Sequence, residues 1–143
     1  TQEHYLLMFK NYLVVLYLET RSNMYKLIIW KAIWTDSGPE TGTDSYILNY
    51  KPTFQDMYKH LSTDMIEITK GYDKDISDRS FDMYIDEESK LKPVVVKNTK
   101  ATKAWYDWQE RTGRQCIPGD FIAGHVAIIK KVNNDRQRSN EAA

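Results

Sequence analysis

A short run of helical periodicity in the middle of the chain constrains the fold more than any other feature. Four apolar residues recur there at spacings of three and four, which places them in one stripe along an α-helix. These residues are Phe54, Met57, Tyr58 and Leu61. Thr53 can cap the helix, and Asp56 adds a carboxylate in the first turn, where the helix dipole favours negative charge. The pattern predicts a helix over about 53–62 that needs an apolar layer to pack against.

Segments of alternating apolar and polar residues surround this helix and predict the strands of that layer. They cover about 24–34, 45–50, 65–71, 81–86 and 121–130. The turn-forming residues of 35–44 predict a hairpin with a long polar tip. The stretch 91–96 contains Pro93, which suits an edge strand better than a central one. The last segment is apolar on both faces and is predicted to be a central strand.

A second helix is predicted over about 99–112, with Asn98 or Thr99 as its cap and Gly113 at its end. Its apolar face consists of Ala101, Ala104, Trp105 and Trp108. We therefore expect an α+β fold, in which a twisted mixed or antiparallel sheet of about five strands packs against the two helices in a single small domain.

The domain is expected to span 24–131 and to be followed by a flexible polar tail over 132–143. Residues 1–23 differ from the rest, because they contain no Gly, Pro, Asp or Ala and are rich in Leu, Tyr and Val. Two interpretations of this segment stay open. It is an N-terminal helix packed on the domain, or it is a non-native upstream extension of a gene that starts at Met24, where the preceding codons can contain a purine-rich ribosome-binding sequence.

The cysteine content and the hydropathy of the chain indicate the cellular compartment in which we expect the protein. The single cysteine, Cys116, cannot form a disulfide within the chain and is typical of a reducing compartment. The most apolar stretch, 5–18, contains Lys10 and Asn11 and is shorter than the roughly 18–20 residues of a membrane span. We therefore expect a cytoplasmic protein that does not contact a membrane.

Charge is distributed unevenly along the chain, although the formal net charge is zero. Residues 53–90 carry ten acidic and five basic side chains, whereas residues 91–143 carry five acidic and ten basic side chains. If the fold keeps these two segments apart, the molecule has an acidic face and a basic face.

Five carboxylates form a candidate acidic binding surface. They are Glu67, Asp82, Asp86, Glu87 and Glu88. In the strand 81–86 the alternation predicts Phe81, Met83 and Ile85 on the inward face and Asp82, Tyr84 and Asp86 on the outward face. Carboxylates four residues apart in a strand are separated by about 13 Å, too far to share a metal ion unless a neighbouring strand contributes. We expect this surface to dock a basic protein surface.

Cations and aromatic rings alternate over 97–114 and form a candidate basic and aromatic surface. Its residues are Lys100, Lys103, Trp105, Trp108, Arg111 and Arg114. Nucleic-acid bases stack on such rings while Lys and Arg neutralise phosphates. The alternative is that both tryptophans belong to the core and the charges only solvate the helix. On the polar side, Lys103, Asp107 and Arg111 are spaced for i,i+4 ion pairs.

The sequence predicts no catalytic residue, metal ligand or cofactor. Its three histidines have no metal-ligand spacing with Cys116, and its six glycines form no phosphate-binding loop. The aspartates of 73–78 begin like a calcium loop but lack its glycine and its closing glutamate. A nucleophile pair of Cys116 and His125, or an acid and base pair among the aspartates, stays open as the basis of a small hydrolase.

Several short motifs follow one another in a defined order along 53–130. They are the first helix followed by Met65, Ile66, Glu67 and Ile68, a strand running into 86–91, the segment 98–101, and Asp120, Ile122 and Gly124 leading into the apolar 126–129. Read from Met24, this order resembles a family found mostly in phage and plasmid genomes and catalogued as domain of unknown function 3846.

The chain also departs from that family's pattern. The hairpin of 24–50 is longer than expected for the family, the segment 99–119 carries an extra helix, and Ser89 stands where a turn glycine is usual. The resemblance implies an origin in a phage or another mobile element. The family has no agreed activity, so no catalytic role follows from it.

We therefore expect a non-enzymatic accessory protein of a phage or mobile element, which binds a host or viral protein in the cytoplasm of a bacterial host without a small-molecule cofactor. The alternative is a weak nucleic-acid-binding module that uses the 97–114 helix and the basic tail. A hydrolase that uses Cys116 or the aspartates is the third interpretation.

Overall fold

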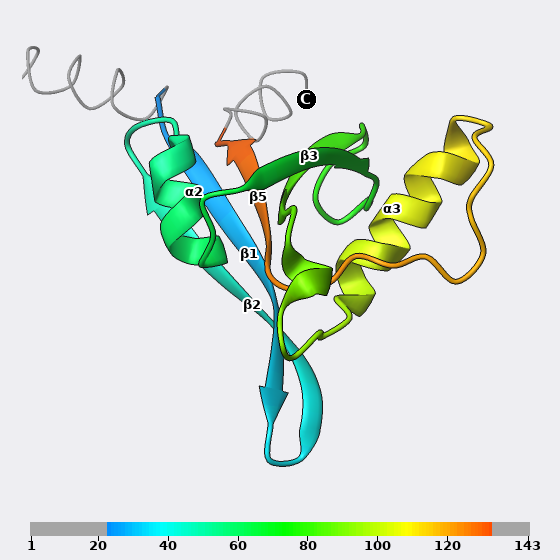
Figure 1. The fold of residues 1–143 in the computed structure, drawn as a ribbon. Coiled ribbons are helices and arrows are strands. Elements are labelled where there is room, and N and C mark those ends of the chain that lie inside the picture. Colours follow the sequence, from blue (N-terminus) through cyan, green and yellow to red (C-terminus); the bar gives the residue numbers. More distant parts are fainter. Residues whose placement is uncertain (1–22, 133–143) are drawn as a thin grey trace, which may run out of the picture.

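Five strands and two α-helices make up residues 23–132, the part of the chain that the computed structural model describes (Figure 1). The elements are β1 (Tyr25–Thr35), β2 (Gly38–Leu48), α2 (Phe54–Leu61), β3 (Ile66–Gly71), β4 (Phe81–Asp86), the 3-10 helix η1 (Ser89–Leu91), α3 (Thr99–Arg111) and β5 (Val126–Lys131). The interpretations of residues 1–23 and of the tail 132–143 lie outside the described residues, apart from Asn23 and Val132.

The strands form one antiparallel sheet in the order β2-β1-β5-β4-β3. The last strand in sequence, β5, therefore lies at the centre, and Val126, Ala127 and Ile128 in it are fully buried. This confirms the central strand that its continuous apolar character predicts. The expected beginning at residue 121 is wrong, because Gly124 has a positive φ of 79° and breaks the extended backbone just before β5.

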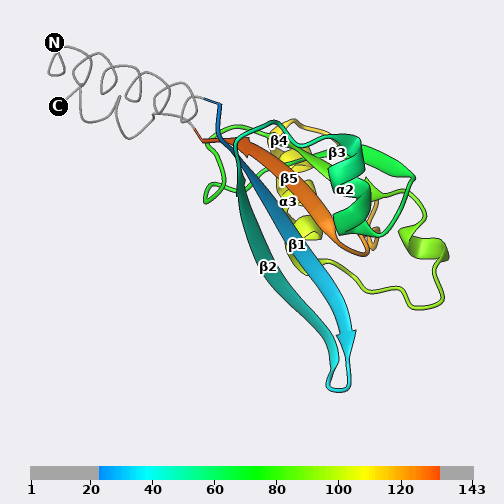
Figure 2. The same cartoon turned by 90° about the vertical axis from the view of Figure 1, so that its left-hand side faces the viewer.

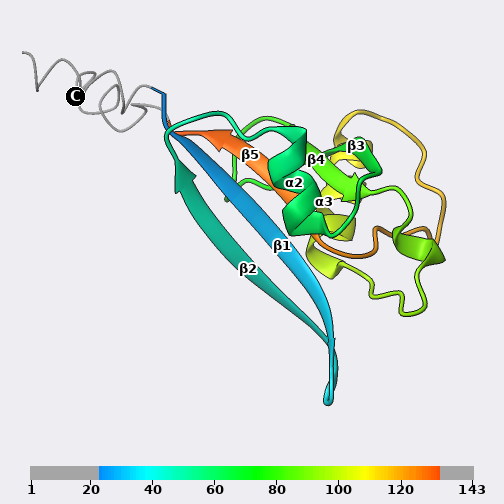
Figure 3. The same ribbon diagram turned by 60° about the vertical axis from the view of Figure 1, so that its left-hand side comes forward.

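The two helices cover opposite faces of the sheet, α2 in front of it and α3 behind it in Figures 2 and 3. Strand β1 divides its side chains between them, since Leu27 and Ile29 lie on the α2 side while Ile28 and Trp30 lie on the α3 side. The α2-side core contains Leu27, Ile29, Met57, Leu61 and Ala127. The α3-side core contains Ile28, Trp30, Met83, Ala101, Ala104, Ile122, Val126 and Ile128. The expected α+β fold is confirmed.

Helix α2 begins where its sequence pattern predicts. The Thr53 hydroxyl accepts a hydrogen bond from the Asp56 amide at 3.3 Å, and the Asp56 carboxylate accepts one from the Thr53 amide at 2.8 Å. This capping box satisfies two backbone donors that a helix leaves without partners. The helix ends at Ser62, whose φ of 53° is left-handed. Met57 and Leu61 of its apolar stripe are buried, and each such side chain contributes about 1.5–3 kcal/mol of hydrophobic stabilisation.

Asn98 caps α3 and is completely buried. Its Oδ1 accepts from the Ala101 amide at 3.0 Å, and its Nδ2 donates to the carbonyls of Trp30 and Gly124, each at 2.9 Å. One side chain thus joins the start of α3 to β1 and to the segment that enters β5. Gly113, with φ of 71°, ends the helix as expected.

The outward face expected for β4 is covered, and this prediction is wrong for Tyr84 and Asp86. Tyr84 packs against the α2-side core, and Asp86 is 4% exposed. The alternation of apolar and polar residues in β4 is typical of a sheet with one covered face and one exposed face. Here a helix lies on each side of the sheet, so both faces of β4 are covered. The strand expected over 91–96 is also absent from the described fold, in which η1 and an irregular segment occupy 89–96.

The long polar tip expected for the first hairpin is wrong as well. The strands pair up to Thr35 and Gly38, so Asp36 and Ser37 alone form the turn. The Thr35 hydroxyl accepts from the Ser37 amide and donates to the Gly38 carbonyl, which adds two side-chain hydrogen bonds to this tight turn. Polar residues of 38–44 are therefore strand residues exposed to solvent, not loop residues.

The hairpin projects beyond the rest of the sheet (Figure 1). Strand β5 pairs with β1 only from Tyr25 to Trp30, so the paired residues 31–42 around the turn have no third strand beside them. We call residues 31–42 the hairpin arm. At its base, the Ala32 amide donates a 3.2 Å hydrogen bond to Nδ1 of His125. Over the described residues, the helices are too short and too polar to traverse a lipid bilayer.

Candidate functional site

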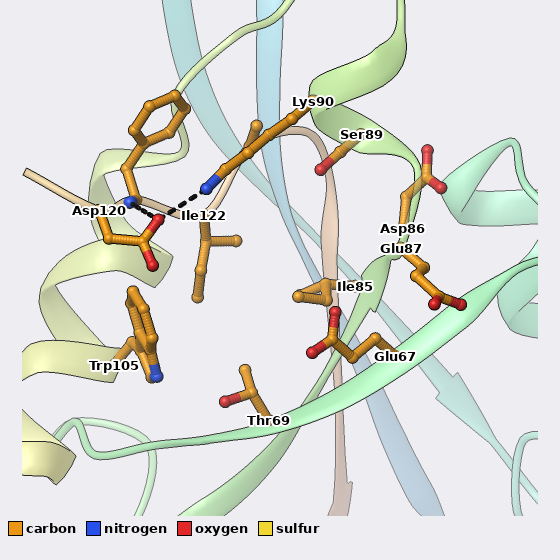
Figure 4. Close-up of a pocket in the computed structure, with 12 residues that line it drawn as sticks. Glu67, Thr69, Ile85, Asp86, Glu87, Ser89, Lys90, Trp105, Asp120 and Ile122 are labelled. Carbon is orange, nitrogen blue, oxygen red and sulfur yellow. Dashed lines mark hydrogen bonds and ion pairs between the residues drawn. The ribbon is translucent and has the colours of Figure 1, made fainter. Parts of the chain in front are cut away.

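A cavity of about 190 Å³ opens between β3, the end of β4 and the N-terminal half of α3 (Figure 4). Its lining comes from four separate parts of the chain. The lining residues are Glu67, Thr69, Ile85, Asp86, Glu87, Ser89, Lys90, Trp105, Asp120, Phe121, Ile122 and Ala123. Ile85, Ile122 and Ala123 make an apolar floor, while charged groups and the Trp105 ring stand around it.

Lys90 and Asp120 form an ion pair on one side of this cavity. Lys90 Nζ lies 2.7 Å from Asp120 Oδ1 and 4.5 Å from the centroid of the Phe121 ring. The Phe121 amide donates to the same Oδ1 at 2.9 Å, and the Tyr106 hydroxyl donates to the Asp120 carbonyl. The hydrogen bond from Lys90 holds the pKa of Asp120 below its usual value. Asp120 therefore stays ionised and fixed at neutral pH.

Glu67 stands on the other side. Figure 4 shows its carboxylate extending from β3 into the cavity beside Ile85, with the Trp105 ring on the opposite wall. Among the ion pairs between described residues, none involves Glu67 or the neighbouring Glu87. The cavity thus contains one ion pair, two carboxylates that have no ion pair among the described residues, and an indole ring across from Glu67, an arrangement that attracts a cation.

Asp86 lines the cavity but belongs to a buried ion pair behind it. Lys92 Nζ lies 2.8 Å from its Oδ2, and the Glu88 amide donates to its Oδ1 at 3.0 Å. Burial raises the pKa of Asp86, but the hydrogen bonds from Lys92 and Glu88 outweigh it and leave the pKa lowered. Asp86 and Ser89 also line a second cavity of about 170 Å³ on the α2 side, which contains His125.

The fold therefore divides the five carboxylates of the expected acidic surface. Glu67 and Glu87 meet at the 190 Å³ cavity. Asp82 lies directly across from Lys70 on β3 and pairs with it, and Glu88 is exposed in the turn without lining this cavity. For Asp86, the prediction of an exposed binding residue is wrong, because Lys92 and the α2 layer bury it.

The expected basic and aromatic surface is also divided. Three of its cations lie on rings of the chain itself: Lys100 over Trp30 at 5.1 Å, Arg111 over Tyr72 at 3.8 Å and Arg114 over Trp108 at 4.8 Å. The i,i+4 pair of Lys103 with Asp107 is present at 3.4 Å, whereas Arg111 makes no such pair among the described residues. Trp105 stacks on Tyr106 and belongs to the acidic cavity.

The cations of α3 also face nearby carboxylates. Lys100 and Lys103 line a third cavity, of about 290 Å³, together with Asp73, Asp75 and Asp107. Mixed charge of this kind does not make the continuous positive track that binds a nucleic-acid backbone.

The sequence reasoning missed Lys90 and Asp120 as site residues. They are 30 residues apart and meet only because η1 and the segment before β5 approach one another. The one available signal was the position of Asp120 at the head of the apolar run into β5.

No three His, Cys, Asp or Glu side chains within 23–132 lie close enough to hold a metal ion. His125 uses Nδ1 to accept from Ala32, and Cys116 is not among the residues of the cavity that His125 lines. The pair of Cys116 and His125 therefore gains no support. Comparisons of the chain with protein-family models, curated proteins and solved structures find no match.

Proposed function

We propose that this protein is a binding module that captures a basic side chain of a partner protein in the 190 Å³ cavity. The observation that carries the proposal is the position of Glu67. Its carboxylate points into a cavity with an apolar floor, faces an indole ring and has no ion pair among the described residues.

The lining matches the chemistry of a lysine or arginine side chain. The aliphatic stem of the guest would lie on Ile85 and Ile122, and its charged group would lie between Glu67 and Trp105. A cation over an indole contributes about 0.5–2 kcal/mol, depending on how far water is excluded. The Lys90–Asp120 pair is already neutral, so it shapes the cavity wall without cancelling the charge of Glu67.

The resemblance to a phage and plasmid family supports a wider form of the same proposal. The protein would act as a non-catalytic accessory factor of a mobile element, in the cytoplasm of a bacterial host, against a basic surface of a host or viral protein. Nucleic-acid binding through α3 is less well supported, because the cations of that helix contact the chain's own rings and carboxylates.

An NMR titration tests the proposal directly. The probe is a blocked glycine-arginine-glycine tripeptide, and the lysine tripeptide is a second probe. We expect shifts of the Trp105 indole and of amides of β3, an affinity that falls as salt rises, and at least a fivefold weaker affinity for Glu67→Gln.

Glu110→Gln is the matched control, because Glu110 is exposed on α3 and does not line the cavity. It removes the same charge from the molecule and should leave peptide affinity unchanged. Equal losses in both variants, or shifts that do not include Trp105, would show that the peptide responds only to overall charge.

A further inference from the structure

Strand β2 is the outermost strand at one end of the sheet, and its outer edge pairs with no other strand of the described part of the chain. The Val132 amide donates to the Met24 carbonyl at 2.9 Å, so these two residues form a hydrogen-bonded pair. The register then directs the backbone N–H and C=O groups of the even-numbered β1 residues toward β5. The backbone groups of the odd-numbered β1 residues therefore point toward β2, where they pair with even-numbered residues. The backbone groups of the odd-numbered β2 residues are left pointing outward. The outward backbone groups belong to Pro39, Thr41, Thr43, Ser45 and Ile47.

The two faces of β2 differ in charge. The side chains of the same five β2 residues lie on the α3 side, where all are exposed and uncharged. Trp34 shares this face and is 60% exposed, and Ile47 is 55% exposed. The opposite face carries Lys31, Glu40 and Asp44. An exposed edge beside an exposed apolar face favours pairing with another strand.

We infer that a second copy of this chain covers this edge, with β2 pairing antiparallel to β2 about a twofold axis through Thr43. In this register Thr43 is directly across from Thr43 of the second copy. Thr41 is across from Ser45 of the second copy, and Pro39 is across from its Ile47. Pro39 lies at the end of the paired region, where its missing N–H removes the fewest hydrogen bonds. The two sheets join into one, and the contact is the same on both chains.

The register brings together the two most exposed apolar side chains on this face of the hairpin, Trp34 and Ile47. Trp34 is directly across from Pro39 within its own hairpin. Ile47 of the second copy takes the next place in the same row, on the same face, so the indole and the isoleucine cover Pro39 together. The twofold axis repeats this row on the other side of Thr43.

The charged face selects the same register. Asp44 of the second copy stands opposite Gly42. The Lys31 side chain passes over this glycine, with its Cε 3.7 Å from the position that a β-carbon on Gly42 would occupy. Lys31 already lies 3.1 Å from its own Asp44, so two lysines and two aspartates alternate across the axis. Shifting the register by two residues places Glu40 opposite Asp44, or Asp44 opposite itself, and like charges directly opposite destabilise a strand pair.

Sedimentation of the full chain tests the inference, with an expected mass of twice 16.8 kDa. Thr43→Pro removes an outward N–H that has no partner strand within residues 23–132, and we expect it to sediment as the single chain with an unchanged circular dichroism spectrum. Thr43→Val keeps the N–H and should remain dimeric. A wild-type chain that stays at 16.8 kDa at the concentrations used for NMR overturns the inference.

A cysteine trap gives a second measurement that does not depend on the proline variant folding. In a Cys116→Ser background, Thr43→Cys faces its own copy and should form a disulfide-linked dimer under mild oxidation. Thr41→Cys faces Ser45 and should not. Equal cross-linking of both variants, or of neither, contradicts the twofold axis at Thr43. The 190 Å³ cavity lies beside β3 at the other end of the sheet, so loss of the dimer leaves tripeptide binding to be measured separately.

Discussion

At the scale of single residues, Asn98 joins three segments of the fold through one side chain. It is fully buried, and its amide group supplies a helix cap and two donors to carbonyls of different segments. Thr102 extends this network, because its hydroxyl donates to the Asn98 carbonyl at 2.7 Å and accepts from the Ile122 amide at 3.0 Å. Buried polar groups without partners cost about 1–3 kcal/mol each, so the network stabilises the fold only while it is complete.

Asn98→Ala should therefore lower the free energy of unfolding by about 3–4 kcal/mol, since it removes the cap of α3 and leaves the Trp30 and Gly124 carbonyls without their donor. Urea denaturation followed by circular dichroism measures this loss. Asn49→Ala is the control, because Asn49 is exposed after β2 and should change stability by less than about 0.5 kcal/mol. A loss below about 1 kcal/mol for Asn98→Ala would mean that water replaces the amide.

At the scale of elements, the base of the hairpin arm depends on a histidine. Beyond Trp30, β5 no longer pairs with β1, and Nδ1 of His125 accepts the hydrogen bond of the Ala32 amide in its place. Only neutral imidazole can accept at this nitrogen. Burial lowers the pKa of His125 below its ordinary value of 6.5, and the nearby Lys31 and Lys92 lower it further, whereas Asp44 opposes them. The buried Asp86 lines the same cavity.

Because the pKa of His125 is lowered in the folded protein, the unfolded chain binds the proton more readily. The stabilisation is complete above about pH 6.5 and is lost as pH falls through the folded value. We expect the free energy of unfolding to fall between pH 7 and pH 5, together with the protection factor of the Ala32 amide, which is its exchange rate compared with that of an unstructured peptide at the same pH. His125→Gln should remove this dependence, whereas His60→Gln should retain it. An Ala32 protection factor that stays constant across this range would contradict the role of His125.

At the scale of the whole molecule, local patterns predicted the elements but not how they meet. The stripe of 54–61 and the apolar run of β5 depend on neighbouring residues, so their helix and central strand were predictable. The side of the sheet that each helix covers depends on long-range topology, and for this reason Asp86 was placed on the wrong surface. The cavity combines Glu67, Trp105 and Asp120, and a local pattern cannot place residues so far apart in sequence together.

The same topology mixes charges that are separated in sequence. Lys92 reaches from the basic C-terminal part to Asp86 of the acidic middle part, and it also donates to the Ser62 carbonyl at 3.1 Å. This side chain therefore connects the end of β4, the end of α2 and the segment after η1. The expected separation into an acidic and a basic face is wrong at this contact, where one segment neutralises the other.

Removing Lys92 should change the pH dependence of the whole fold. Lys92→Met leaves the Asp86 carboxylate buried without its cation, and we expect a loss of about 2–3 kcal/mol at pH 7, less than for a fully buried pair because Lys92 is partly exposed. In the wild type the lowered pKa of Asp86 gives stability that is lost as pH falls below about 3.8. In the variant the largest influence that lowers this pKa is gone, so less stability should be lost on acidification than in the wild type.

The double variant Asp86→Asn with Lys92→Met separates charge from packing, because it removes both charges while keeping similar volumes. It should recover part of the lost stability at pH 7. Lys103→Met is the control for loss of a lysine, since its pair with Asp107 is exposed and contributes about 0.3–0.5 kcal/mol. Urea midpoints measured from pH 3 to pH 8 compare all four proteins. If Lys92→Met follows the wild-type curve at every pH, then Asp86 does not depend on Lys92 for its charge, and the contact between the two segments is not what joins α2 to the end of β4.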